Sequence, residues 1–157
     1  MPVSDYTPTV DSVAAYLRAR TKTRGGTEAG TFNSQDAAEN NKTRPTSEEV
    51  TEMIGNALRD VSGVVGADID SAYFDAATDV AALRTAMLVE LSYWPDQINS
   101  GRSPYPQLKE LYDEAWENLL TALGISTDAG GGAVPVGAGY PSYGGFPTTA
   151  IGMEQPL

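Results

Sequence analysis

The feature that most constrains the fold is a long apolar stretch from Ala72 to Trp94. Its apolar residues recur every three or four positions and so share one face of a helix: Tyr73, Ala76, Val80, Leu83, Met87, Leu91 and Trp94. A second apolar row widens this face beyond half of the circumference: Phe74, Ala77, Ala81 and Leu88. Charged residues interrupt the stretch too evenly for a membrane span: Asp75, Asp79, Arg84 and Glu90. We therefore expect a central helix that neighbouring helices cover from several sides.

A helix start near Pro45 is the clearest local signal in the sequence. Thr46 followed three residues later by Glu49 matches a capping box, with acidic side chains in the first turn. One face of the following segment is apolar: Val50, Met53, Ile54, Ala57, Leu58 and Val61. We expect a helix over 47–62 that Gly63 and Gly66 end.

The starts of two other helices are less sharply defined. A short N-terminal helix is expected over about 9–20, with Thr9 or Asp11 able to start it. Asp70 or Ser71 can cap the central helix. In both cases the sequence leaves the two candidates open.

A last helix is expected over 106–123. Proline is well tolerated in a first turn, and Gly124 is a natural residue to end the helix. Before it, Pro95 stops the central helix, and 96–106 reads as a link rich in turns. The predicted fold class is all-α: a small helical bundle of a short N-terminal helix plus three main helices.

Two segments have no helical pattern. The first, 21–45, is a long polar loop in which Phe32 is the only large apolar residue, and we expect Phe32 to anchor it. The run Thr27–Phe32 can pair as a small hairpin. The second, 125–157, is an extended arm dominated by glycine and proline, whose composition cannot form a core. The predicted organisation is thus a helical domain over 1–124, which includes the loop, and a C-terminal arm.

Composition removes most routes to catalysis. The chain has no cysteine and no histidine, so thiol chemistry, thiolate metal sites and the usual general base are absent. Asp68, Asp70 and Asp75 lack the turn glycine and terminal glutamate of a calcium loop. The glycine runs near 130–139 follow no strand and open no helix, so they do not indicate a phosphate loop. We therefore expect no enzyme activity, no metal and no cofactor.

Charge is distributed unevenly along the chain. The formal net charge is −11, and residues 46–123 hold 14 acidic side chains against four basic ones. Such a surface keeps a protein in solution and repels nucleic acid at close range. The N-terminus lacks the charged and apolar regions of a signal peptide, so we expect synthesis and use in a cytoplasm, or in a particle assembled there.

Four basic residues stand apart from this acidic background. Arg18, Arg20, Lys22 and Arg24 follow the predicted N-terminal helix. A polyanion is one candidate partner, although binding without flanking aromatic residues would be weak and sensitive to salt. An acidic protein surface, including that of a neighbouring copy, is another.

The order of these features resembles the head-to-tail connector (adaptor) proteins of long-tailed bacteriophages. The resemblance lies in Leu17–Thr21 at the end of a short helix, in Gly30–Phe32 within the loop, and in Thr43–Thr46 before an acidic first turn. It is strongest over 8–62 and continues as a helix pattern to Leu123. The arm has no motif that matches.

The resemblance implies a structural role in the virion neck, at the head-tail interface. Connectors of this kind assemble in the host cytoplasm into a ring, usually a dodecamer, beneath the portal protein. The ring extends the channel through which genomic DNA passes without sequence-specific binding, and it receives a downstream neck or tail-completion protein. No membrane is involved.

The resemblance also gives the arm a role. In related connectors a C-terminal extension often reaches the portal, so we expect the arm to dock on the portal or on an adjacent subunit through its separate apolar side chains: Tyr140, Tyr143, Phe146 and Ile151. Other virion roles, in tail completion or capsid cementing, stay open. So does a small DNA-binding packaging protein that uses the basic residues.

Overall fold

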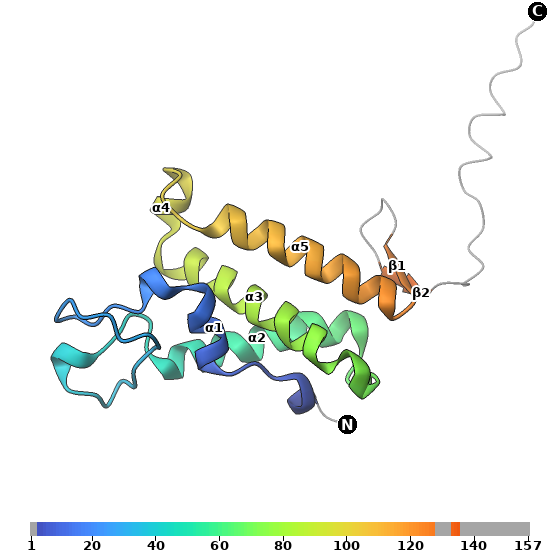
Figure 1. Cartoon of the computed structure of the whole chain (residues 1–157), viewed down its shortest axis with the longest axis horizontal. Helices are drawn as coiled ribbons and strands as arrows, with labels where there is room; N and C mark the ends of the chain where they lie inside the picture. Colours follow the sequence, from blue (N-terminus) through green and yellow to red (C-terminus); the bar gives the residue numbers. More distant parts are fainter. Residues whose placement is uncertain (1–2, 128–132, 136–157) are drawn as a thin grey trace, which may run out of the picture.

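The protein is an all-α bundle, as its helical periodicities predict (Figure 1). The structure, a computed structural model, describes residues 3–127 and 133–135. The α-helices are α1 (Val10–Tyr16), α2 (Ser47–Val65), α3 (Phe74–Tyr93), α4 (Pro95–Asn99) and α5 (Tyr105–Ala122). Short 3-10 helices cover Val3–Tyr6, Arg18–Arg20, Glu39–Asn41 and Ser71–Tyr73. The predicted short N-terminal helix and three main helices are all present.

Helix α3 is the centre of the bundle, and α1, α2 and α5 all pack against it. Its buried positions are mostly small or β-branched, among them Ala77, Val80, Ala81, Ala82, Ala86 and Val89. Small side chains let the neighbouring helices approach closely, so that α3 is covered on several faces. None of the helices in the described part of the chain is long and apolar enough to cross a membrane.

Both caps of α2 follow from its sequence. Thr46 and Glu49 form the predicted capping box, in which each side chain accepts a hydrogen bond from the other residue's backbone N–H. The helix, however, continues through Gly63 to Val65, three residues beyond the expected end. Val61 is fully buried and Val65 packs on the core, so packing offsets the cost of a glycine within the helix. Gly66, with φ of 89°, then ends α2.

The two open choices of helix start are resolved by hydrogen bonds. The Thr9 side chain accepts from the N–H of Ser12 and so caps α1. Asp70 accepts from the N–H of Ala72 and caps the 3-10 turn that leads into α3. Helix α1 itself ends at Tyr16, earlier than expected, because the chain tightens into the 3-10 turn Arg18–Arg20.

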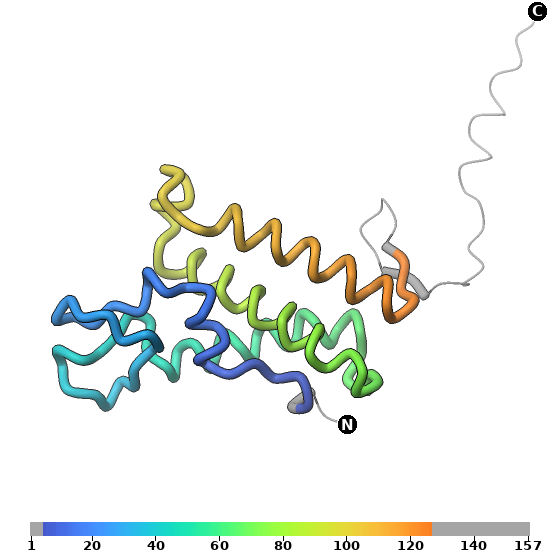
Figure 2. The backbone as a smooth tube through the Cα atoms, in the orientation of Figure 1, coloured from blue at the N-terminus to red at the C-terminus, as the bar shows by residue number. Residues whose placement is uncertain are grey.

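The link between α3 and α5 contains the short helix α4, which the sequence did not predict. Pro95 both ends α3 and occupies the first position of α4, where its missing N–H is not needed. Helix α5 starts at Tyr105, and Gly124 follows it with φ of 71°. Figure 2 shows the resulting path, with the loop 21–45 at one end of the bundle and the turn after α5 at the other.

A small antiparallel pair of strands follows α5. Strand β1 (Ile125–Thr127) pairs with β2 (Ala133–Pro135), in the register Ile125 with Pro135. β1 also contacts α5. No strand was predicted here, because glycine and proline dominate the region. The four predicted docking residues of the arm, Tyr140, Tyr143, Phe146 and Ile151, lie outside the described residues.

Candidate functional site

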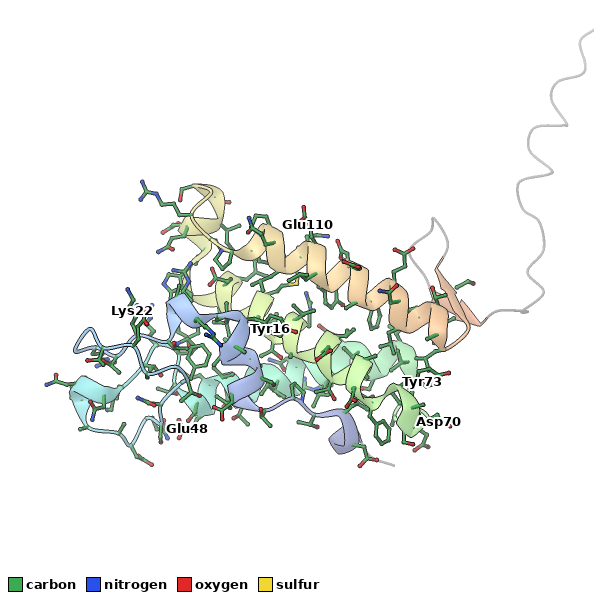
Figure 3. The ribbon with its side chains drawn as sticks, viewed as in Figure 1. Tyr16, Lys22, Glu48, Asp70, Tyr73 and Glu110 are labelled. Carbon is green, nitrogen blue, oxygen red and sulfur yellow. The ribbon has the colours of Figure 1, made fainter. Side chains whose placement is uncertain are left out.

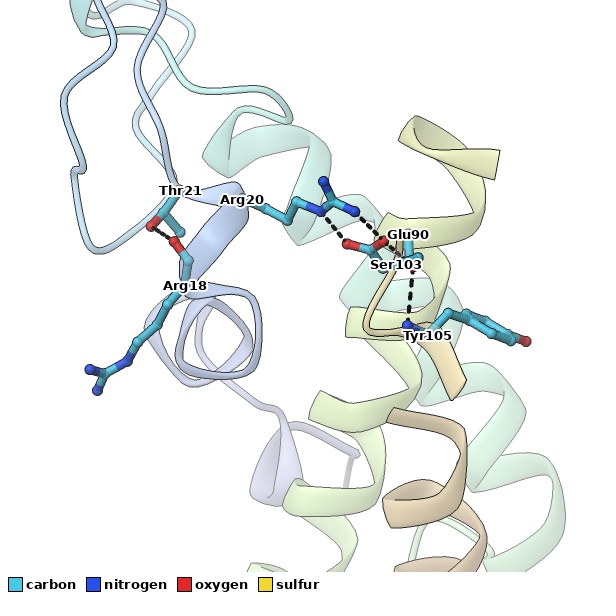
Figure 4. Close-up of polar contacts among 6 residues, drawn as sticks. All are labelled: Arg18, Arg20, Thr21, Glu90, Ser103 and Tyr105. Carbon is cyan, nitrogen blue, oxygen red and sulfur yellow. Dashed lines mark hydrogen bonds and ion pairs between the residues drawn. The ribbon is translucent and has the colours of Figure 1, made fainter. Parts of the chain in front are cut away.

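The four basic residues Arg18, Arg20, Lys22 and Arg24 do not form one patch. In Figure 4 the Arg18 side chain points away from the bundle, whereas Arg20 points towards α3. Arg24 forms an exposed ion pair with Glu39. Lys22 is exposed at the loop end of the molecule (Figure 3). Of the four, only Arg18 and Lys22 have no ion pair with another described residue.

Arg20 belongs to a buried polar cluster centred on Glu90 of α3 (Figure 4). Its Nε donates to Glu90 Oε1 at 2.7 Å, and a terminal nitrogen donates to Oε2 at 2.9 Å. This is the bidentate geometry that gives arginine–carboxylate pairs their strength. The Glu90 side chain is fully buried, and that of Arg20 is 13% exposed.

Two further contacts complete this Arg20–Glu90 cluster. Ser103 donates its hydroxyl to Glu90 Oε2 at 2.5 Å and accepts from the N–H of Tyr105 at 3.1 Å. The Arg20 guanidinium also lies over the Trp94 ring, 4.3 Å from its centroid. The cluster therefore joins the start of the loop, the end of α3 and the start of α5.

In the sequence, Glu90 served only as one of the charges that argue against a membrane span, and no binding or structural role was predicted for it. The sequence did contain one signal for its role: Glu90 is a lone carboxylate among predicted core positions, one turn before Trp94. A buried carboxylate requires a polar or charged partner. The sequence held no sign that Arg20, 70 residues away, was that partner.

The loop 21–45 folds against the bundle. Phe32 is 3% exposed and belongs to the main core, as expected of the loop's anchor. Isolated bridges pair Lys22 with Glu28 and Thr23 with Thr43. The tight turn thus lies at Gly25–Gly26, where Gly26 has φ of 87°, and Glu28 of the run Thr27–Phe32 pairs across it with Lys22.

Glu48, in the first turn of α2, binds the middle of the loop at Ser34 and Gln35 (Figure 3). One carboxylate oxygen accepts from the Ser34 hydroxyl at 2.6 Å, and the other accepts from the N–H of Gln35 at 3.0 Å. These hydrogen bonds favour the charged form and lower the pKa of Glu48 from 4.5 to about 2, with the Ser34 bond as the largest cause. Protonation of the carboxyl weakens both hydrogen bonds, because the neutral group is a poorer acceptor.

The glutamate's low pKa predicts an acid-sensitive attachment of the loop. A depressed folded-state pKa stabilises the protein fully above the unfolded value of 4.5, and this contribution is lost as the pH falls towards 2. In Glu48→Gln, we expect the free energy of unfolding to fall less steeply over that range than in the unmodified protein. Urea unfolding at a series of pH values measures it. Glu52→Gln, an exposed change one turn along α2, is the control and should leave the slope unchanged.

Two surface hollows lie beside α1. One, of about 430 Å³, is lined by Asp11, Ala15, Arg18, Thr21, Glu28 and Gly30. The other, of about 250 Å³, lies between α1, α3 and α5 and is called the α1–α5 groove here; its lining includes Tyr16, Asp79, Leu83, Leu111, Glu114 and Ala115.

The outer surface of the helices is strongly acidic. On α5 the exposed charges are mostly carboxylates: Glu110, Asp113, Glu114 and Glu117, with Lys109 paired to Asp113. Across the described residues, these and other acids form no group of three that could hold a metal ion. A surface of this charge repels other polyanions at close range.

Comparisons of the chain with protein-family models, with curated proteins and with solved structures find no match.

Proposed function

We propose that the protein is a head-to-tail adaptor of a long-tailed bacteriophage. In this role it forms a ring, usually of twelve copies, in the virion neck. The ring sits beneath the portal protein, lengthens the DNA channel and offers a surface to a downstream neck or tail-completion protein. The proposal requires no catalytic step and no cofactor.

The observation that carries the proposal is the placement of two non-helical regions at opposite ends of one helical bundle. The loop 21–45 lies at one end, held by the Arg20–Glu90 cluster, Phe32 and Glu48 (Figure 1). Strands β1 and β2, from which the chain continues into the arm, lie at the other end. A subunit with distinct regions at opposite ends can contact a different partner on each side.

Electrostatics supports the same role. Genomic DNA must move through the channel without being held, and an acidic helical body repels its phosphates. The alternative of a DNA-binding packaging protein loses support, because Arg20 is committed to Glu90 and Arg24 to Glu39. Of the four basic residues near the end of α1, only Arg18 and Lys22 then have no ion pair with a described residue.

Co-expression with the portal protein of the same virus tests the proposal. We expect the two to copurify, and electron microscopy to show a twelve-fold ring on the portal. A chain lacking 136–157 should bind the portal more weakly, because the arm is expected to reach it. Location of the protein on the capsid lattice or at the tail tip would contradict the adaptor role. Salt-dependent duplex binding that Arg18→Ala with Lys22→Ala abolishes would favour the packaging role instead.

A further inference from the structure

The α1–α5 groove has a partly apolar, partly acidic lining and no covering element among the described residues. Leu83 and Ala115 form part of its lining, and Leu111 beside them is 49% exposed. Two carboxylates, Asp79 of α3 and Glu114 of α5, stand at the same groove. Neither forms an ion pair with another described residue. The groove thus offers an apolar contact together with free hydrogen-bond acceptors.

One phenol already lies in this groove, because Tyr16 of α1 is part of its lining beside Asp79 (Figure 3). Burial raises the pKa of Tyr16 above its usual range, and the nearby charge of Asp79 raises it further. A tyrosine side chain combines an apolar ring with one hydroxyl donor, so it can use both the apolar lining and a carboxylate.

The chain itself supplies tyrosines close to this groove. Its lining residues on α5, from Leu111 to Asn118, follow one face of the helix towards β1. Strand β2 ends at Pro135, which pairs with Ile125 just after α5. Beyond it the sequence reads VGAGYPSY over 136–143, with no charge. The nearest large side chains after β2 are therefore Tyr140 and Tyr143.

The distances allow these residues to reach the groove within one chain. Helix α5 rises about 17 Å between Leu111 and Ala122. The eight residues 136–143 span up to about 28 Å when extended. A segment tethered this closely has an effective concentration on the order of millimolar, well above that of a second copy in dilute solution.

We propose that the segment Tyr140–Tyr143 docks in the α1–α5 groove of its own chain in the free subunit. One tyrosine ring covers Leu111 and Ala115, and its hydroxyl donates to Asp79 or Glu114. The segment that is expected to reach the portal then has a defined resting place on the bundle. This inference does not depend on the adaptor role, because it concerns the isolated chain.

Disulfide trapping in the full-length protein tests the docking. The chain has no cysteine, so Ser142→Cys with Asn118→Cys introduces the only two thiols, and both tyrosines stay intact. The control pairs Ser142→Cys with Glu117→Cys, which lies at the same height on α5 but is rotated by about 100° around the helix. Both α5 positions are exposed. Circular dichroism of each variant verifies that the helices are retained.

We expect the pair at 118 to form an intramolecular disulfide about tenfold faster than the pair at 117, because docking raises the local concentration of the second thiol. Adding Tyr140→Ser and Tyr143→Ser should reduce the rate at 118 to that of the control. Mass spectrometry and non-reducing gels separate bonds within a chain from bonds between chains. Equal rates at 117 and 118, or bonds only between chains, would overturn the proposal, whether or not the protein binds a portal.

Discussion

Replacing Arg20 by alanine is expected to lower the free energy of unfolding by about 3–5 kcal/mol, because it removes one partner of a buried ion pair. The Glu90 carboxylate, which is fully buried, would keep the Ser103 hydroxyl as a donor but lose both guanidinium hydrogen bonds. Arg20 also covers Trp94, so the change removes packing as well as charge. Urea unfolding followed by circular dichroism at neutral pH measures the loss.

Arg24→Ala is the matched control for this prediction. Arg24 is four residues along the same basic run and also pairs with a glutamate, but both side chains are more than half exposed. Solvent screens such a pair, so its removal should leave stability nearly unchanged. If the two variants lose similar amounts of unfolding free energy, the buried Arg20–Glu90 pair is no more important to stability than the exposed Arg24–Glu39 pair, and the prediction is wrong.

A double substitution separates the need for a pair from the need for packing. Arg20→Met with Glu90→Leu removes both charges and keeps apolar volume at the site. Burying two charges carries a large desolvation cost, so this variant should recover most of the stability that Arg20→Ala loses. The Ser103 hydroxyl then loses its acceptor, and we therefore expect the recovery to be incomplete.

The bundle could be predicted from the sequence because its signals are local. The spacing of apolar residues over 72–94 identified the central helix, and Thr46 with Glu49 identified the start of α2. The errors lie where tertiary packing decides. Gly63 stays within α2 because Val61 and Val65 pack on the core, and α4 forms in a link whose residues have no helical period.

The Arg20–Glu90 cluster could not be predicted from the sequence, because tertiary packing decides which side chains meet there. The basic run drew attention because its charges are adjacent in sequence, yet neighbouring side chains turn in different directions once the helix ends. Arg20 and Arg18 are separated by one residue, and only Arg20 finds a carboxylate on α3. The pairing of residues 20, 90 and 103 is a property of the fold, and no local pattern encodes it.

The loop 21–45 depends on a single large apolar side chain, and this gives a second strong prediction. Phe32→Ala is expected to lower the free energy of unfolding by about 3–5 kcal/mol, because it leaves a cavity in the main core. Phe32→Leu, which keeps most of the volume, should cost clearly less. Urea unfolding of both variants measures the difference.

Hydrogen exchange can show whether that loss is local to the loop. The loop is also held by the Arg20–Glu90 cluster at its start and by Glu48, which binds Ser34 and Gln35 near its middle. If Phe32 anchors the loop despite these two contacts, Phe32→Ala should lower the protection of the amides of Thr23 and Arg24, which donate to the carbonyls of Thr27 and Lys42 within the loop. Protection within α3 should fall only as far as global stability falls. Unchanged protection of the loop amides would contradict the role of Phe32 as its anchor and assign that role to the two polar contacts.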